Sequence, residues 1–529
     1  MEYDVCIIGS GLAGLAAFEE LKKKKVKVCL LEKENNYLSN ISSEDIKITN
    51  LNNHFKISDV NVEKFGGNSS IWAGRCQLFD EIDFKNPLNK SVNWPIGLKE
   101  IDKYYQKAST FLNIGNSSKF KNKKNFKLDP NLNINCNEIW SSSPEVQKKN
   151  IFKNKDIKLG YTCVGFIQKN KKNVSYALFK RSNKDKIIKI SAKIFIVACG
   201  GLASNKLILN SMNEKKGLKL QSKKLVGKYY MGHLGECIAN IQFSSKIKEK
   251  IFFGLINESG TYTRRLIKFS KNFLIKNKLL NIQFYLKNPD ISNPTHNDGL
   301  LSLIYLVLKL PIINSFFAPM TIIKKIKQRK NEKIISHIYN LVKNPKSIIN
   351  GLCNLFYRKF IKREKYPTRF LFKPIYNFNG LQFLAEQKPN TSCKIFLLKK
   401  KDSLDLRKAV VDFNWSKKEI NSIIKSHLLL DEILKKKNLG KLVFNVPKKK
   451  LFSFIKKNCI DGAHQIGGLR MGTNYKNGVT DKYGKLFGLK NVFISSTALF
   501  PTGGASTPTF MLISLVFRQV DFIIKNLKK

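Results

Sequence analysis

Acidic residues are scarce in this 529-residue chain, because 38 Asp and Glu stand against 95 Lys and Arg and give a formal net charge of +57. Such a charge would ordinarily indicate a nucleic acid or an anionic membrane as partner. Arg is scarce as well, although bidentate phosphate recognition favours Arg over Lys. The Lys runs are scattered, at residues 22–25, 399–401, 435–437 and 448–450. We therefore expect solvated faces and no nucleic-acid partner.

Two further absences bear on compartment and metal content. The ten Cys form no C-x-x-C pair and no zinc-like spacing, so no metal site is expected. The chain opens directly on an apolar strand at residues 3–8, which leaves no room for a signal peptide. Both features favour a cytoplasmic location.

No uninterrupted apolar run is long enough for a convincing membrane span. The longest candidate, residues 300–320, is broken by Lys309, Pro311 and Pro319. Two alternatives remain for it: it covers an active site, or it lies on a membrane surface as a peripheral contact, which for a cytoplasmic protein is the inner membrane surface.

What the chain does contain is typical of a globular enzyme of two to four domains, with 43% hydrophobic and 25% charged residues. Three separated segments each place a buried strand before a Gly-rich turn, at residues 5–14, 193–201 and 491–504. They predict an α/β fold with a discontinuous Rossmann-like domain on a parallel sheet. A substrate domain would be built on a mainly antiparallel sheet with covering helices. The predicted boundaries are 1–80, 155–234 and 455–529 for the cofactor domain, and 81–154 and 235–454 for the substrate-binding cap.

The first Gly-rich turn has the pattern of a dinucleotide-binding unit. It runs from strand to helix, and Glu32 ends the next strand, where a carboxylate can accept hydrogen bonds from a ribose diol. The free N–H groups at the helix start would hold the phosphates. This unit predicts a bound dinucleotide without distinguishing FAD from NAD. Its residues are Gly9, Ser10, Gly11, Leu12, Ala13 and Gly14.

A second Gly-rich stretch suits a large planar ring. Paired glycines with small polar residues let backbone amides close on such a ring, and Trp72 is placed to pack beside it. Taken alone, the stretch is equally typical of a loop that ends in a core Trp. Its candidate residues are Gly66, Gly67, Asn68, Ser69 and Trp72.

Taken together, these motifs resemble the glucose-methanol-choline (GMC) oxidoreductase family. Within the family they are most similar to bacterial members associated with surface-polysaccharide synthesis. The segments that carry the resemblance recur in the family's order: 9–14, 66–74, 198–204, 226–233, 386–390, 464–472, 478–481 and 500–509. The resemblance implies an FAD-dependent enzyme that transfers a hydride from a CH–OH carbon of an alcohol or sugar to flavin N5. It also implies cofactor contacts at Val164, Ala198, Gly200, Ser496, Pro508 and Thr509.

Within this resemblance, His464 occupies the position of the catalytic base, and an imidazole suits proton removal near neutral pH. Thr507 stands where relatives carry a second His or Asn, and its single hydroxyl is a weaker donor. Ile71 stands where some relatives attach FAD through His, so noncovalent FAD is expected. His233 is interpreted as structural, at a domain junction.

Several alternatives stay open at this point. No residue pattern separates a dehydrogenase from an oxidase, and the electron acceptor is unknown. The same fold would also suit a flavin-binding protein with degraded catalysis, or a cationic protein associated with a membrane surface or nucleic acid.

Overall fold

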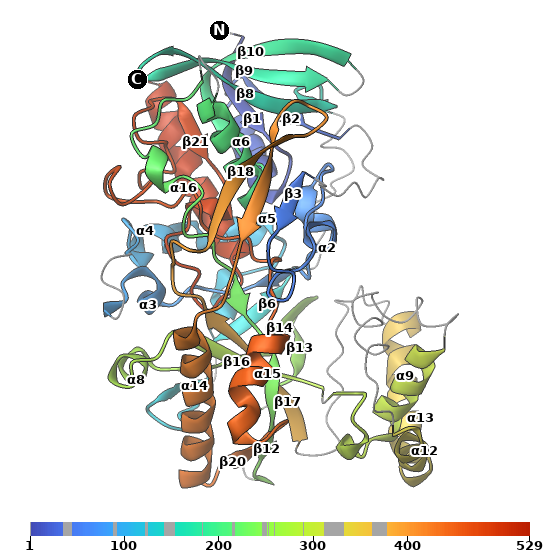
Figure 1. The fold of residues 1–529 in the computed structure, drawn as a ribbon. Coiled ribbons are helices and arrows are strands. Elements are labelled where there is room, and N and C mark those ends of the chain that lie inside the picture. Colours follow the sequence, from blue (N-terminus) through green and yellow to red (C-terminus); the bar gives the residue numbers. More distant parts are fainter. Residues whose placement is uncertain are drawn as a thin grey trace.

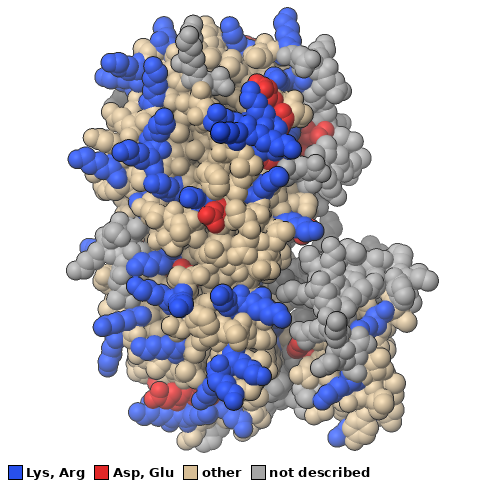
Figure 2. Space-filling model, in the orientation of Figure 1, with Lys and Arg blue, Asp and Glu red and all other residues tan. Residues whose placement is uncertain are grey.

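The computed structural model describes the chain in thirteen stretches, namely residues 2–34, 45–87, 93–121, 125–141, 154–181, 184–213, 217–245, 251, 253–258, 260–288, 290–310, 333–361 and 378–528. Both termini lie at the same end of the molecule, beside the first sheet (Figure 1). Lys and Arg side chains are spread over the face seen in Figure 2 and do not gather in one tract.

The first sheet is parallel at its centre, in the order β7-β2-β1-β10-β21. Side chains of the two central apolar runs are buried on both faces, which is why these strands lack polar alternation. The strands are β1 (Tyr3–Ile8), β2 (Val28–Glu32), β7 (Ile157–Leu159), β10 (Lys184–Val197) and β21 (Val492–Ile494). Segments from the start, middle and end of the chain thus meet in one Rossmann-like sheet, and the predicted fold class is confirmed.

The long strand β10 belongs to two pairing patterns. Its second half continues the parallel sheet, while its first half pairs antiparallel with β9 (Asn173–Arg181), which pairs with β8 (Tyr161–Asn170). Helices α1 (Leu12–Lys23), α6 (Gly200–Asn213) and α16 (Thr509–Leu527) follow the Gly-rich turns. They pack with the sheet into the larger apolar core.

The second sheet is antiparallel, in the order β20-β12-β17-β16-β15-β5, with β11 paired to β17. It lies at the opposite end of the molecule from the parallel sheet (Figure 1). The strands are β5 (Leu132–Asn133), β11 (His233–Leu234), β12 (Cys237–Phe243), β15 (Ile267–Phe269), β16 (Ile282–Lys287), β17 (Phe378–Glu386) and β20 (Gly440–Phe444). It forms the second apolar core together with α14 (Lys417–Lys436) and α15 (Leu451–Asn458).

Helix α14 (Lys417–Lys436) shows how the sequence builds this second layer. Ser416 and Glu419 form a capping box, in which each side chain meets the other's backbone N–H. Ile420, Ile423 and Leu430 recur at helical spacing and are buried. Helix α15 (Leu451–Asn458) packs beside α14. The apolar stripes therefore cover one face of the antiparallel sheet.

Two small sheets complete the fold. One contains β4 (Arg75–Cys76), β6 (Asn137–Trp140), β13 (Leu255–Glu258) and β14 (Thr261–Arg265), and the other β3 (Ile46–Ile48), β18 (Lys394–Lys401) and β19 (Arg407–Asp412). Among the residues that the structure describes, the remaining α-helices are α2 (Ile57–Val60), α3 (Glu81–Phe84), α4 (Leu98–Ile101), α5 (Tyr105–Phe111), α8 (Lys271–Lys276), α9 (Gly299–Lys309), α12 (Ile334–Lys343) and α13 (Pro345–Phe356).

The domain boundaries given above remain a prediction. Helix α5 packs on α16, so part of the segment 81–154 contributes to the larger core. Of the apolar stretch 300–320, the described part is α9, whose Leu300, Leu301, Tyr305 and Leu308 are buried. The rest of that stretch lies outside the described residues.

Candidate functional site

A cavity of about 610 Å³ extends from the carboxyl ends of the parallel strands to the antiparallel sheet. Ligands of open α/β sheets bind at such strand ends. All but three of the predicted site residues line it: Gly9, Ser10, Gly11, Leu12, Ala13, Glu32, Gly67, Asn68, Ser69, Trp72, Ala198, Gly200, His464, Ser496, Thr507, Pro508 and Thr509. The structure thus brings together residues that are nearly 500 positions apart in the sequence.

The Gly9–Gly14 turn forms the wall at one end of the cavity. Gly9 has φ +100°, and a Cβ there would lie 2.8 Å from the Ala198 carbonyl oxygen. A Cβ at Gly14 would lie 2.0 Å from the Gly9 carbonyl oxygen, so Gly14 lets α1 pack against the turn. No side chain caps the start of α1 at Gly11. Its first N–H groups are consequently available to an anion.

Glu32 closes the same end of the cavity from β2. The Ser10 backbone N–H and hydroxyl both donate to Glu32 Oε2, at 2.7 and 2.6 Å. The Lys33 N–H donates to Oε1 at 2.8 Å. Burial raises the pKa of Glu32, although these hydrogen bonds oppose the rise. The carboxylate is therefore held in a fixed orientation beside the turn, as a ribose acceptor requires.

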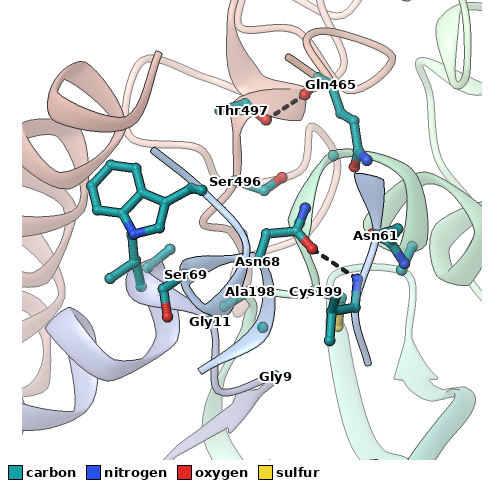
Figure 3. Close-up of a pocket in the computed structure, with 18 of the residues that line it drawn as sticks. Gly9, Gly11, Asn61, Asn68, Ser69, Ala198, Cys199, Gln465, Ser496 and Thr497 are labelled. Carbon is teal, nitrogen blue, oxygen red and sulfur yellow. Dashed lines mark hydrogen bonds between the residues drawn. The ribbon is translucent and has the colours of Figure 1, made fainter. Parts of the chain in front are cut away.

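The second Gly-rich stretch lies directly against the first. Gly66 has φ +85° and forms a bridge with Gly11. Asn68 fixes the loop, because its Oδ1 accepts from the Val62 N–H at 2.8 Å and its Nδ2 donates to the Val60 carbonyl at 2.9 Å. Asn68 and Ser69 lie near Gly11 and Ala198 in Figure 3. The two stretches form one rigid cradle.

Three predicted residues do not line the cavity. Gly14 and Gly66 act through the backbone geometry just described, one behind the turn and one beneath the loop. Val164 is buried in β8, whereas its neighbours Thr162 and Cys163 line the cavity.

At the other end of the cavity, His464 faces a buried carboxylate. Its Nδ1 lies 3.4 Å from Asp461 Oδ2, and its side chain is 24% exposed. Asp461 also accepts the backbone N–H groups of His233 at 2.6 Å and of Ala463 at 3.0 Å. Burial acts to raise the pKa of Asp461, but His464 and the His233 backbone N–H hold it well below its usual range. The Asp461 carboxylate is therefore ionised.

His233 lies closer to this centre than a purely structural residue would. Its ring packs edge-on to that of His464, with centroids 4.8 Å apart. Its Nε2 lies 3.1 Å from the Gly503 carbonyl oxygen, which makes Nε2 the protonated nitrogen. Burial, together with His464, lowers the pKa of His233 to about 4. The ring is thus neutral and packs as a fixed wall beside His464.

Thr507 is anchored by two hydrogen bonds. Its N–H donates to Gln77 Oε1 at 2.8 Å, and its hydroxyl donates to the Arg75 carbonyl at 3.1 Å. The hydroxyl proton therefore points to the backbone, while the oxygen keeps acceptor capacity. The next residues, Pro508 and Thr509, begin α16, whose N-terminus faces the cavity without a side-chain cap.

A buried charge network behind Thr507 had no signal in the sequence. Glu138 accepts from Arg75 Nε at 2.7 Å and from Arg264 Nε at 2.5 Å. Burial acts to raise the pKa of Glu138, but the two guanidinium groups hold it below its usual range. Both guanidinium groups pack on the Tyr285 ring, at 4.4 and 4.1 Å from its centroid. The two guanidinium groups carry one more charge than the Glu138 carboxylate neutralises. This net positive charge lies at the cavity wall, which Arg75 and Tyr285 line.

One group of described residues has the spacing of a metal site. The candidate ligand atoms of His233, Asp461 and His464 all lie within 4.8 Å of one another. However, the Asp461 oxygens already accept backbone N–H groups. The hydrogen bonds explain the cluster without a metal. Asp461 is not among the residues predicted from the sequence, although an acid three residues before His464 is a signal that marks it.

Comparison with known proteins gives two family matches and a common fold. The family model described as GMC oxidoreductase matches residues 389–515, and that of pyridine nucleotide-disulphide oxidoreductase matches residues 3–138. No curated protein sequence matches.

Two similar solved structures each cover 99% of this chain and of their own. One is an FAD-dependent oxidoreductase from Chaetomium thermophilum, with a TM-score of 0.54 and 11% identity. The other is a formate oxidase variant from Aspergillus oryzae, studied for FAD modification, with a TM-score of 0.53 and 12% identity. At such identities they establish that the fold is shared over its whole length.

Proposed function

Because this chain belongs to the GMC oxidoreductase family, we propose that it binds FAD and oxidises the CH–OH group of an alcohol or sugar, with His464 as base. The observation that carries the proposal is the placement of His464 at the cavity end opposite the dinucleotide turn, with ionised Asp461 behind its ring. A base and a cofactor cradle thus share one cavity.

The lining residues fit FAD. The turn at residues 9–14 and the uncapped start of α1 suit a pyrophosphate, Glu32 suits a ribose, and the second Gly-rich stretch suits the ring system. When bound, FAD supplies the hydride acceptor. Ile71 lines the cavity and is nearly half exposed, and it offers no nucleophile for a covalent link. We therefore propose noncovalent FAD.

Asp461 would set the tautomer of His464. An ionised carboxylate opposite Nδ1 favours a proton on that nitrogen, which leaves the lone pair on Nε2. Nε2 can then take the hydroxyl proton as the carbon loses its hydride. The neutral His233 ring and the Asp461 carboxylate restrict the rotation of His464, so the base is held ready. Asp461 acts here as a positioning residue.

Positive potential at two places would stabilise developing negative charge. The uncapped N-terminus of α16 points at the cavity beside Thr507. The Arg75–Glu138–Arg264 network adds net positive charge on the substrate side. Thr507 connects the start of α16 with the charge network through its hydrogen bonds to Arg75 and Gln77.

The fold does not define which compound donates the hydride, since one protein of this fold is a formate oxidase. We propose that the protein is cytoplasmic and acts on a small-molecule substrate of alcohol or sugar type. The electron acceptor, the choice between dehydrogenase and oxidase, and the link to surface-polysaccharide synthesis remain open predictions.

The decisive experiment is an anaerobic screen of alcohols, polyols, sugars and sugar nucleotides, followed by the bleaching of the flavin absorbance. We expect at least one donor to bleach the wild type, and Asp461→Asn to slow that bleaching less than His464→Ala does while FAD stays bound. Bound flavin that no donor reduces would favour a flavin-binding protein with degraded catalysis. Acid precipitation should release the flavin into the supernatant, and flavin retained in the pellet would contradict the noncovalent proposal.

A further inference from the structure

Helices α9, α12 and α13, with the helical turn at Tyr357–Ile361, form a small unit at one side of the molecule (Figure 1). We call it the helical unit. Its inner side is well packed, because α9 buries Leu300, Leu301, Tyr305 and Leu308 against its neighbours. The helical unit therefore does not need its outer side to complete a core.

Polar contacts fix the rotation of α12 within the helical unit. His337 and Asn340 face inward and are buried; His337 Nδ1 lies 3.0 Å from the Ser302 hydroxyl, and Asn340 Nδ2 donates to the Pro294 carbonyl at 2.8 Å. This reverses the usual arrangement, in which a surface helix turns its polar face to water. The apolar side chains of α12 are consequently directed outward.

The outward side of the helical unit is apolar. Ile335 and Val342 are 84% and 77% exposed, and further exposed apolar residues lie on α12, α13 and the helical turn: Ile334, Ile338, Tyr339, Ile349, Leu352, Phe356, Tyr357, Phe360 and Ile361. At 100° per residue, the five on α12 fall within an arc of roughly 140°. Soluble proteins rarely expose so many large apolar side chains on one small unit unless these have a partner. We call this surface the α12–α13 face.

The charge around this face has one sign. Residues 333–361 contain no Asp or Glu, and their cations are Lys333, Lys343, Lys346, Arg358 and Lys359. Lys333, Lys343 and Lys346 are exposed at the ends of α12 and α13, and Lys343 Nζ lies 5.5 Å from the Tyr339 ring centroid. Where the helical unit is visible in Figure 2, neutral surface alternates with Lys and Arg. A second copy of the same face would meet this charge with like charge.

We propose that the α12–α13 face docks on an anionic lipid membrane. Apolar side chains would enter the boundary between headgroups and acyl chains, and the exposed Lys333, Lys343 and Lys346 would pair with lipid phosphates. Within the part of the chain that the structure describes, no helix has the length and apolar character needed to cross a bilayer. The helices would therefore lie in the plane of the surface. The sequence raised such a contact for residues 300–320, which stays a prediction: α9 buries Leu300, Leu301, Tyr305 and Leu308, and residues 311–320 lie outside the described residues.

The test is co-sedimentation of the full-length protein with vesicles, either of phosphatidylcholine alone or with a large fraction of phosphatidylglycerol. We expect binding to anionic vesicles at least tenfold stronger than to neutral ones. The double variant Ile335→Asp/Val342→Asp should reduce that binding at least tenfold. Since both side chains are so exposed, the variant should keep its fold and its flavin, which circular dichroism and flavin absorbance check.

The matched control is Ile187→Asp/Ile256→Asp, which makes the same change in charge at two exposed Ile residues of β10 and β13. This control should bind vesicles as the wild type does. Equal loss in both double variants, equal binding to neutral vesicles, or no binding by the wild type would each overturn the proposal. Sedimentation velocity without lipid tests whether the α12–α13 face instead binds a second copy of the chain. A dimer that is lost only in Ile335→Asp/Val342→Asp, together with no vesicle binding, would assign the face to a second copy. None of these readouts depends on the oxidation of a donor.

Discussion

The two ends of the cavity are built by different means. At the dinucleotide end, the walls are backbone: two Gly-rich stretches bridged at Gly11 and Gly66, and a helix start without a side-chain cap. At the reacting end, the walls are side chains from distant segments, including Arg75, Tyr285 and Asp461, and Arg75 is held from behind by buried Glu138. At Gly9 and Gly14 the backbone leaves no room for an added Cβ, whereas the side-chain walls depend on buried charge. The two ends should therefore fail in different ways when they are altered.

The largest effect is expected at the backbone end. In Gly14→Val, the new Cβ would lie 2.0 Å from the Gly9 carbonyl oxygen, so α1 must move away from the turn. We expect complete loss of bound flavin, measured as the ratio of flavin to protein absorbance. Gly97→Val is the matched control, because a Cβ at Gly97 meets nothing within 4 Å. Flavin retained by Gly14→Val at wild-type occupancy would contradict this account of the turn.

A large effect on rate alone is expected at the reacting end. His464→Ala removes the proposed base, and general-base catalysis typically contributes about 100- to 10,000-fold. Stopped-flow reduction by a donor found in the screen should slow by that factor while FAD stays bound. His337→Ala, in the helical unit, controls for the loss of a His far from the cavity. If His464→Ala is reduced as fast as the wild type, the mechanism proposed for His464 is wrong even though the family stands.

The same contrast explains what the sequence could predict. The Rossmann-like sheet, α1 and the residues of the two Gly-rich stretches follow local rules, because a strand, a turn and a helix start are encoded within about ten residues. His464 and Thr507 were placed in the cavity only through the resemblance to a family. The pairing of Glu138 with Arg75 and Arg264 joins residues 63 and 126 positions apart, and no local pattern marks it. Buried charge networks of this kind depend on tertiary packing.

Stability should also depend on pH at the reacting end. Burial raises the pKa of Glu386 to about 7, and the β-strand pair places Glu386 opposite His233. Since the folded state holds this proton more tightly than the unfolded chain, the contribution of Glu386 to stability is full below pH 4.5 and is lost as pH rises through about 7. The raised pKa corresponds to on the order of 3 kcal/mol.

Glu386→Gln should remove the part of the stability loss that comes from ionisation of Glu386. We expect the free energy of unfolding to fall less between pH 5 and pH 8 in Glu386→Gln than in the wild type, by denaturant titration. Glu81→Gln is the control, because the Glu81 side chain is largely exposed and pairs with Lys271 on the surface. A Glu386→Gln profile that parallels the wild type would show that Glu386 is ionised throughout this range.

The smallest effect is expected at Thr507, which lies at the reacting end between Arg75 and the start of α16. Its hydroxyl donates to the Arg75 carbonyl and its N–H to Gln77, so the side chain contributes one neutral hydrogen bond at the wall of the cavity. Such a bond is worth about 1 kcal/mol, or roughly fivefold in rate. We expect Thr507→Ala to slow flavin reduction by that factor.

Thr507→Ser keeps the hydroxyl and should be reduced at the wild-type rate, which separates the loss of the hydrogen bond from the loss of the methyl group. The backbone N–H of residue 507 stays in both variants, so the bond to Gln77 and the start of α16 should be preserved and FAD content unchanged. A Thr507→Ala rate that falls as far as that of His464→Ala would place Thr507 in proton transfer itself. An unchanged rate in both variants would mean that α16 and the Arg75 network stabilise the developing charge without the Thr507 hydroxyl.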